Sequence, residues 1–219
     1  EKREFISNTK GSLALTDLDI GPDGNMYFCV GGRGGQSSLY RVSYKGKADT
    51  SLSKLDVTSS HAKARKTRHM LEAIHGQPDP KALETAWPYL NDDDYHLRYA
   101  ARIAIEWQDP KTWADKAYSE KDDLAAIHAL LGLARSDLEG SWGNPTYLAP
   151  SVKRLLKVDF DKLDKMGKLA LLRTYGVIMS RGGMPEAAQV RAIGDQLDPR
   201  FPAKDDNLNE ELCRVLCYL

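Results

Sequence analysis

The spacing of apolar residues changes once along this 219-residue chain, near Ser59, and that change limits the folds open to it. Before Ser59, apolar and polar residues alternate over short stretches, which is typical of half-buried β-strands. After Ser59, apolar residues recur at a spacing near 3.6, which is typical of amphipathic α-helices. The sequence therefore predicts a mainly α fold that is preceded by a small antiparallel three-stranded β-meander.

The predicted meander has its strands at 15–20 (LTDLDI), 25–30 (NMYFCV) and 38–44 (SLYRVSY). A GPDG turn at 21–24 joins the first two strands, because its proline presets the first turn position and its last glycine supplies a left-handed residue. A glycine-rich loop at 31–36 leads to the third strand. A meander of this size is marginal in water and has two exposed edges, so we expect another element to pack on it.

The run DIGPDGNMYF, followed by a glycine loop and SLYRV, resembles one blade of a β-propeller of the soluble sugar-dehydrogenase or NHL kind. The match is carried by Asp17 or Asp19, Pro22, Asp23, Gly24, Met26, Tyr27, Leu39, Tyr40, Arg41 and Val42. A propeller needs about four to eight blades. The resemblance therefore implies that residues 1–46 are the last blade of a truncated propeller.

The stretch GGRGG at 31–35 invites comparison with a phosphate-binding loop. Such a loop leads into a helix N-terminus and, in the Walker type, carries a Lys-Ser/Thr pair. A strand follows here instead, so a hairpin loop is the favoured interpretation. Because loops at the strand ends of a propeller can face its central ligand site, Arg33 remains a candidate ligand contact.

A polar linker at 47–60 is expected to lead into a helical domain at 61–219. Alanines at 100, 101 and 104 recur at 125, 126 and 129, a spacing of about 25 residues that favours stacked helical hairpins. Gly182 and Gly183 are expected to end the longest helix. The predicted helices are 61–75, 79–90, 95–107, 110–119, 123–135, 149–157, 163–179, 185–197 and 209 onward.

The helix pair at 79–107, with its Asp-rich turn and the run RYAARIAI, resembles a HEAT repeat. The resemblance implies a right-handed α-solenoid of the HEAT or armadillo kind. The carboxylates of Asp92 and Asp94 favour the positive N-terminus of the second helix. Arg98 and Arg102 are expected to reach acidic groups of an adjacent repeat, as such arginines do in that family, and to stabilise the stacking of repeats.

Charge and hydropathy exclude two classes of partner. The chain has 31 Lys plus Arg and 31 Asp plus Glu, and binding nucleic acid through its phosphates normally needs a basic surplus. There is no apolar run long enough to cross a bilayer and no signal-peptide pattern at residue 1, so membrane insertion is not predicted. Both ends resemble the interior of a longer protein, so we expect a segment truncated at its C-terminal end, with any export signal upstream.

The cysteines and histidines indicate no catalytic or metal site. An odd count of three cysteines argues against a disulfide framework. Cys213 and Cys217 share a helix face, but no nearby His or further Cys completes a zinc site. Packing as small buried groups is the favoured role for these two and for Cys29. His128 lies in an Ala- and Leu-rich helix, which favours a core histidine.

Blade, linker and helical stack in this order resemble the large exported membrane-bound dehydrogenase-like or haem-binding proteins of planctomycete and verrucomicrobial (PVC) type. The stretches that carry this resemblance are LTDLDIGPDGNMYFCVGGRGGQSSLYRV, RHMLEAIH, AWPYLNDDDYHLRYAARIAIEWQ and LLGLAR. The resemblance implies a periplasmic or exported protein with a sugar-dehydrogenase-like propeller and a cytochrome c domain. Its cofactors would be haem c and pyrroloquinoline quinone. This chain has no CxxCH motif and only one of the propeller blades, so both cofactors would lie outside it.

Two functions follow from this reading. In the first, the segment is a non-catalytic scaffold or spacer whose partners are the propeller and cytochrome c domains of its own chain, and any oxidoreductase activity belongs to the full-length protein. In the second, it is a module that binds a protein or a carbohydrate on the concave surface of the stack. An apolar face of the first two helices against the blade would favour the scaffold. An exposed row of aromatic residues would favour binding, and the candidates are Trp87, Tyr95 and Trp107.

Overall fold

The computed structural model describes residues 5–9, 11, 13–32, 34–49, 58–136 and 147–219. The chain divides into two units, Glu1–Lys54 and Leu55–Leu219. The division falls inside the predicted linker, although that linker ends earlier than predicted because Ser60 already begins the first helix. Within the described part of the chain, no helix is both long enough and apolar enough to span a bilayer.

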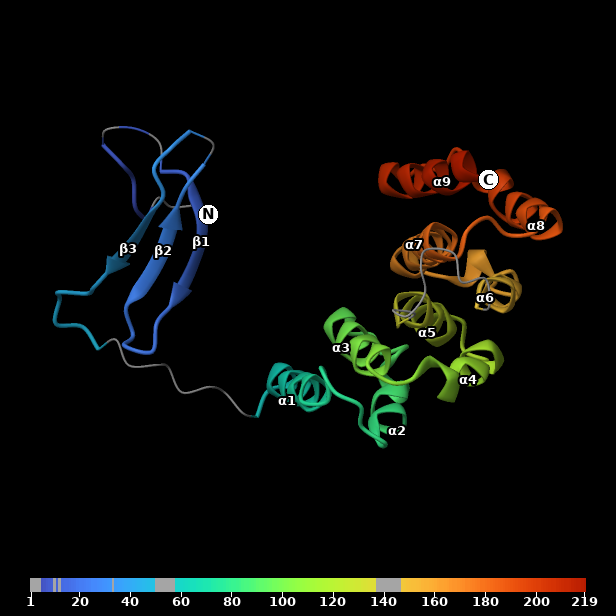
Figure 1. Cartoon of the computed structure of the whole chain (residues 1–219), viewed down its shortest axis with the longest axis horizontal. Coiled ribbons are helices and arrows are strands. Elements are labelled where there is room, and N and C mark those ends of the chain that lie inside the picture. The colour runs from blue at the N-terminus through green and yellow to red at the C-terminus, as the bar shows by residue number, and fades with distance from the viewer. Residues whose placement is uncertain (1–4, 10, 12, 33, 50–57, 137–146) are drawn as a thin grey trace. The chain divides into compact units, whose positions relative to one another are not determined.

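The first unit contains the predicted antiparallel meander (Figure 1). Its strands are β1 (Leu15–Ile20), β2 (Met26–Val30) and β3 (Ser38–Val42), in the order β1-β2-β3. The turn before β2 has the predicted left-handed glycine: Gly24 has a φ of +74°, and its N–H donates to the carbonyl of Gly21 at 2.9 Å. The residues of this turn therefore determine where the chain reverses between β1 and β2.

One face of this sheet carries apolar side chains that the unit itself leaves uncovered. Leu18, Phe28 and Tyr40 lie directly opposite one another across the three strands, so they share a face. Phe28 is buried and stacks on Tyr40, with 5.1 Å between the ring centres. Leu18 and Tyr40 remain 48% and 46% exposed. Among its described residues, the unit buries only Phe28, which is a very small core.

The second unit consists of helices joined by short turns, close to the predicted ranges. Short 3-10 turns at Trp87–Tyr89 and Pro110–Thr112 lie within ranges predicted as continuous helix, which shortens α2 and α4. Two more, at Phe160–Lys162 and Asp198–Arg200, lie outside the predicted helices. The helices are α1 (Ser60–Glu72), α2 (Ala82–Ala86), α3 (Tyr95–Glu106), α4 (Ala114–Ser119), α5 (Asp123–Ser136), α6 (Leu148–Leu155), α7 (Lys165–Gly182), α8 (Ala187–Leu197) and α9 (Asp206–Tyr218).

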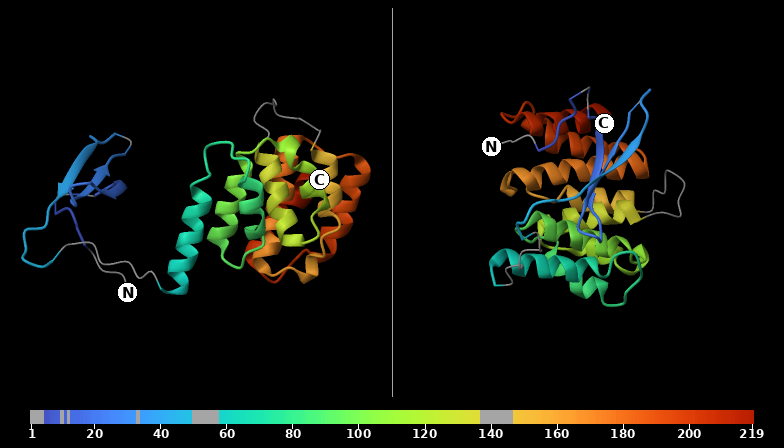
Figure 2. Two further views of the ribbon diagram at one scale, coloured as in Figure 1. Left: turned by 90° about the horizontal axis from the view of Figure 1, so that it is seen from below. Right: turned by 90° about the vertical axis from the view of Figure 1, so that its left-hand side faces the viewer.

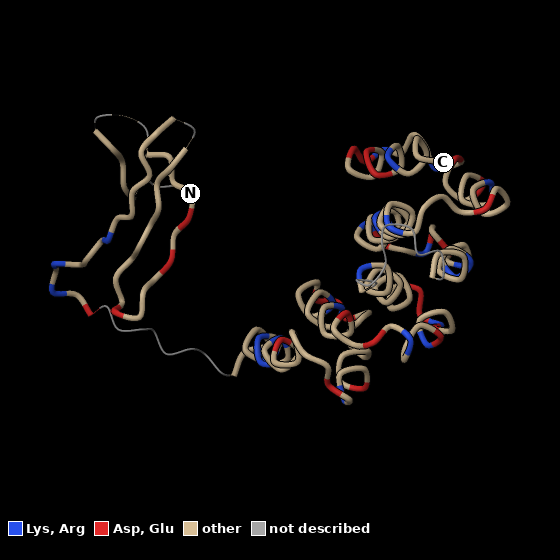
Figure 3. Tube along the Cα trace, viewed as in Figure 1, with Lys and Arg blue, Asp and Glu red and all other residues tan. Residues whose placement is uncertain are grey.

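These helices lie in two rows, which Figures 1 and 2 show from three directions. In one row α1, α3, α5, α7 and α9 pack each against the next. In the other row α4 packs on α6 and α6 on α8, with α2 in line with them in Figure 1. Both kinds of charge occur over the two rows of helices, in keeping with the zero net charge (Figure 3). The apolar core lies between the rows and between successive helices.

Helix ends follow local signals. The side chains of Asp164 and Asp205 accept hydrogen bonds from the first turns of α7 and α9, from backbone N–H groups at 2.7 and 3.1 Å. The cap at Asp205 explains why α9 begins three residues before the predicted start at 209. Gly183 has a φ of +88° and its N–H donates to Met179, so the predicted glycine stop of the longest helix is confirmed.

Candidate functional site

Helix α3 and the residues that flank it carry most of the residues singled out from the sequence, and two aspartates lie at its start. Asp94 is the N-cap: its Oδ1 accepts a hydrogen bond from the N–H of His96 at 2.8 Å. Asp92 in turn accepts from the N–H of Asp94 at 2.8 Å. Asp94 therefore caps the helix N-terminus, whereas Asp92 bonds to the backbone of the cap residue and not to the helix itself.

Arg98 is buried and turns back toward the start of its own helix. Its guanidinium donates to the carbonyl oxygens of Asp92 and Asp93. The predicted contact with an acidic group of an adjacent repeat is wrong for Arg98, because the Asp-rich turn presents main-chain oxygens within reach of a side chain one turn into the helix. Arg98 therefore anchors the turn that joins α2 to α3.

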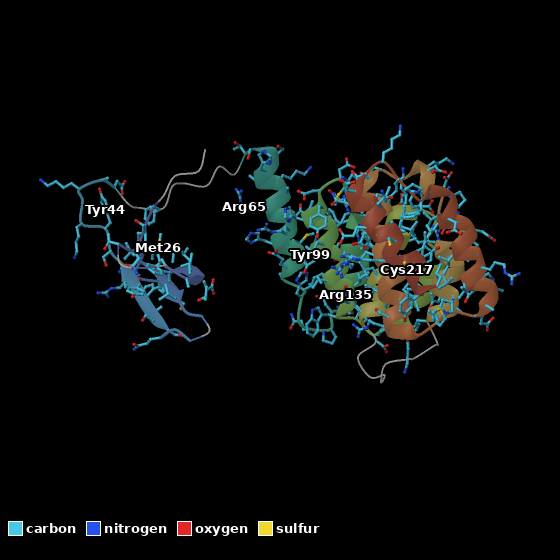
Figure 4. All side chains as sticks on the ribbon, turned by 90° about the horizontal axis from the view of Figure 1, so that it is seen from above. Met26, Tyr44, Arg65, Tyr99, Arg135 and Cys217 are labelled. Atoms are coloured by element: carbon cyan, nitrogen blue, oxygen red, sulfur yellow. The ribbon has the colours of Figure 1, made fainter. Side chains whose placement is uncertain are left out.

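The acidic group that Arg102 contacts lies on its own helix, so the predicted contact with an acidic group of an adjacent repeat is wrong for Arg102 as well. Arg102 pairs with Glu106 one turn along α3, and Nε of Arg135 on α5 lies 3.1 Å from the same carboxylate. Gly132 on α5 faces this cluster, where an added Cβ would lie 3.5 Å from the Cγ atoms of Arg102 and Glu106. These distances are ordinary van der Waals contacts, so the packing of α3 on α5 leaves room for a methyl group at position 132. Arg135 is labelled on the side-chain view in Figure 4.

His128 on α5 is buried as predicted, at 7% exposure. Burial, and then the nearby guanidinium groups of Arg98 and Arg102, lower the pKa of His128 to about 4. Among the described residues, Nδ1 of this ring has no hydrogen-bond partner, so nothing there stabilises a second ring proton. His128 is therefore a neutral core residue of the α3–α5 contact at pH 7, and the neighbouring positive charges oppose its protonation.

Arginines also join later pairs of helices, which the sequence pattern did not indicate. Arg154 on α6 is buried and donates to the carbonyl of Glu120 and to Oδ1 of Asp123, each at 2.9 Å. Arg200, after α8, donates to Oδ2 of Asp161 at 2.6 Å. These contacts span 31 to 39 residues of sequence. Each successive pair of helices is thus fixed to the preceding one by a directed polar contact.

Trp87, a predicted surface aromatic, is buried at 7% exposure, so this prediction is wrong. The 3-10 turn that follows α2 packs against α3 and places the indole edge-to-face with Trp113 at 6.3 Å. Its Nε1–H donates to Oε2 of Glu120 at 2.7 Å. Although burial acts to raise the pKa of Glu120, this hydrogen bond and two from backbone N–H groups outweigh it and lower the pKa. Trp87 is a core residue of the α2–α4 region.

Tyr95 and Trp107, the other two predicted surface aromatics, are exposed at 51% and 48%. Tyr99 on the same helix is exposed at 48% and was missed. The spacing of the two tyrosines in YHLRY, four residues apart, was the signal for it, since such residues share a helix face. The rings of Tyr95 and Tyr99 lie 6.3 Å apart, and the guanidinium of Arg102 lies 5.0 Å from the ring centre of Tyr99.

A pocket of about 500 Å³ lies between α1 and α3, beside Tyr99. His75, just after α1, closes one side of it, since its Nε2 is 2.8 Å from the carbonyl oxygen of Ala100. Arg68 and Glu72 form an ion pair on α1, with 3.1 Å between Nε and Oε1. The lining residues are Arg68, Glu72, His75, His96, Tyr99, Ala100 and Ile103. This pocket is the candidate functional site.

The cysteines are not buried packing groups, so that prediction is wrong: Cys29, Cys213 and Cys217 are all exposed. Sγ of Cys213 and Sγ of Cys217 lie 3.7 Å apart on α9, and this hydrogen bond raises the pKa of Cys213. Cys217 is labelled in Figure 4. No group of three His, Cys, Asp or Glu side chains in the described ranges is arranged to hold a metal ion. The predicted ligand contact Arg33 lies outside the described residues.

Known proteins offer no guide to this site. No protein-family model, no curated protein and no solved structure matches the chain.

Proposed function

We propose that the chain is a non-catalytic scaffold segment of a larger exported redox protein. In this proposal residues 61–219 form a right-handed HEAT-like α-solenoid that acts as a spacer, and residues 1–46 form the last blade of a β-propeller. Haem c and pyrroloquinoline quinone would be held by other domains of the same protein, in the periplasm or outside the cell. The proposal originates in the resemblance of the sequence to the PVC-type proteins.

The observation that supports a spacer role most is the series of polar contacts between successive helix pairs. Glu106 with Arg135, Arg154 with Asp123, and Arg200 with Asp161 each join one pair to the next. In a stack of repeats each unit contacts only its neighbours, so its stiffness depends on such junctions. Directed contacts at each junction favour an element that holds a fixed shape.

The first unit supports the idea that further sheets belong to the protein. Its apolar face leaves Leu18, Ile20 and Tyr40 between 46% and 56% exposed. An apolar face of this kind normally packs against another layer of structure. The neighbouring blades of a propeller would cover it.

Chemical cross-linking of the native protein, followed by mass spectrometry, tests the spacer role. We expect lysines of the helical unit, such as Lys153 and Lys157 on and after α6, to be linked to other domains of the same polypeptide. Links to separate polypeptides alone, with none to its own domains, would contradict the proposal. Both lysines are exposed and are therefore accessible to the reagent.

The second candidate function is a binding module for a protein or a carbohydrate. The exposure of Tyr95 and Tyr99 on α3, and of Trp107 just after it, favours this function, because exposed aromatic side chains mark recognition surfaces. The pocket beside Tyr99 gives this candidate a specific site. The two functions are compatible, since a rigid stack can also present a surface.

A further inference from the structure

The pocket between α1 and α3 is preformed by contacts that do not involve a ligand. The imidazole of His75 bonds to the carbonyl of Ala100, which fixes the end of α1 against the middle of α3. Leu71, on the same stretch of α1, is fully buried in the core. A volume of about 500 Å³ is within the range of small-molecule sites. A site that is already shaped loses less entropy when it binds.

The walls of the pocket combine one exposed aromatic ring with groups of both hydrogen-bonding kinds. Tyr99 contributes a ring that is 48% exposed, together with a hydroxyl. Arg68 contributes only donors, and Glu72 contributes only acceptors. Their side chains are 39% and 44% exposed, so both remain accessible beside the ring. The site therefore offers a planar apolar surface next to a donor and an acceptor.

This combination disfavours the other ligand classes that such a pocket could take. The carboxylate of Glu72 would repel an anion. It also neutralises the positive charge of Arg68, whose Nε lies 3.1 Å from Oε1 of Glu72. Within the described residues, Glu72, His75 and His96 do not form a metal-binding group. A purely apolar ligand would displace water from the charged side chains of Arg68 and Glu72 without offering hydrogen bonds in return, which is unfavourable.

We infer that this pocket binds a neutral saccharide. A sugar hydroxyl both donates and accepts, so adjacent hydroxyls can bridge the guanidinium of Arg68 and the carboxylate of Glu72. The apolar C–H face of a pyranose can lie on the ring of Tyr99, as Tyr presents an apolar body with a polar end. The inference gives the binding-module candidate a ligand class, and it does not depend on the spacer role.

Helix α3 provides a matched control for the test. Tyr95 and Tyr99 are one turn apart and are similarly exposed, but only Tyr99 lines the pocket. The ¹⁵N-labelled chain would be titrated with glucose, galactose, mannose, cellobiose and maltose, and separately with inorganic phosphate at constant ionic strength. Amide shifts would be followed in the unmodified chain and in the variants Tyr99→Ala, Tyr95→Ala and Glu72→Gln.

We expect at least one saccharide to shift amides of α1 and α3 in a saturable way. Tyr99→Ala should weaken that binding about tenfold, and Tyr95→Ala should change it by less than about twofold. Glu72→Gln keeps the size of the side chain, and it should weaken saccharide binding even if Tyr99→Ala fails to fold. The inference is overturned if no saccharide binds, if phosphate binds more tightly than every sugar, or if the two tyrosine variants have equal effects. Because cross-linking of the native protein tests the spacer role separately, either proposal can fail alone.

Discussion

Replacing His128 with leucine is expected to remove a pH dependence from the stability of the helical unit. The pKa of His128 is about 4 in the folded chain and about 6.5 when the chain is unfolded. Because the folded pKa is the lower of the two, the unfolded state takes up the proton first as the pH falls. Stability is therefore fully present above about pH 6.5 and is lost progressively down to about pH 4.

The size of the effect follows from the same two pKa values. Each pH unit within this window costs about 1.4 kcal/mol. Between pH 7 and pH 5, about one and a half pH units lie within this window. The protonation of His128 should therefore lower the free energy of unfolding of the wild-type chain by about 2 kcal/mol. No discount for solvent is needed, since the side chain is 7% exposed. The lowered pKa values of Asp23, Asp159 and Asp205 stabilise the folded chain above their ordinary value of 3.8, and that contribution is lost mainly as the pH falls below this value.

The assay is urea unfolding at pH 7 and pH 5, followed by the far-UV circular dichroism of the helices. The wild-type chain should lose about 2 kcal/mol more than His128→Leu between the two pH values. Proton NMR of the imidazole gives an independent reading of the pKa. Equal losses in the two proteins, or a folded pKa of His128 near 6.5, would refute the placement of this ring beside buried guanidinium groups.

Three further substitutions test the description of the helices, all by urea unfolding at pH 7. Asp94→Ala removes the cap on the N–H of His96 and should cost about 1 kcal/mol; an unchanged stability would contradict the cap. Tyr175→Phe deletes a buried hydroxyl that donates to Gln196 at 2.7 Å, with an expected loss of about 1 kcal/mol, and a gain would contradict that bond. Gly132→Ala should stabilise α5 by up to about 1 kcal/mol, because the new methyl group makes only ordinary contacts; a loss would show that the α3–α5 contact is tighter than described.

Features that depend on neighbouring residues in the sequence could be predicted. The period of two, the GPDG turn and the glycine stop at Gly183 placed the strands and the longest helix within a few residues. Asp94 was assigned to the N-terminus of α3 correctly, because capping is a contact between residues two or three positions apart. The starts of α7 and α9 were less accurate, although the caps Asp164 and Asp205 carry the same signal.

Features that depend on contacts between distant helices could not be predicted. Trp87 and Tyr99 are both aromatic residues on helical turns, and only packing makes the first buried and the second exposed. Arg98 and Arg102 look equivalent in the sequence, but the turn before α3 gives the first a partner of its own. The pocket depends on the approach of α1 to α3, which sequence spacing does not specify.

A measurement on the native protein can test whether this chain is a scaffold segment of a larger redox protein. Its intact mass would be measured together with its visible absorption spectrum after reduction with dithionite. If the chain is such a segment, we expect a polypeptide several times longer than 219 residues that has the sharp reduced bands of c-type haem. A colourless native chain of about this length would contradict the proposal.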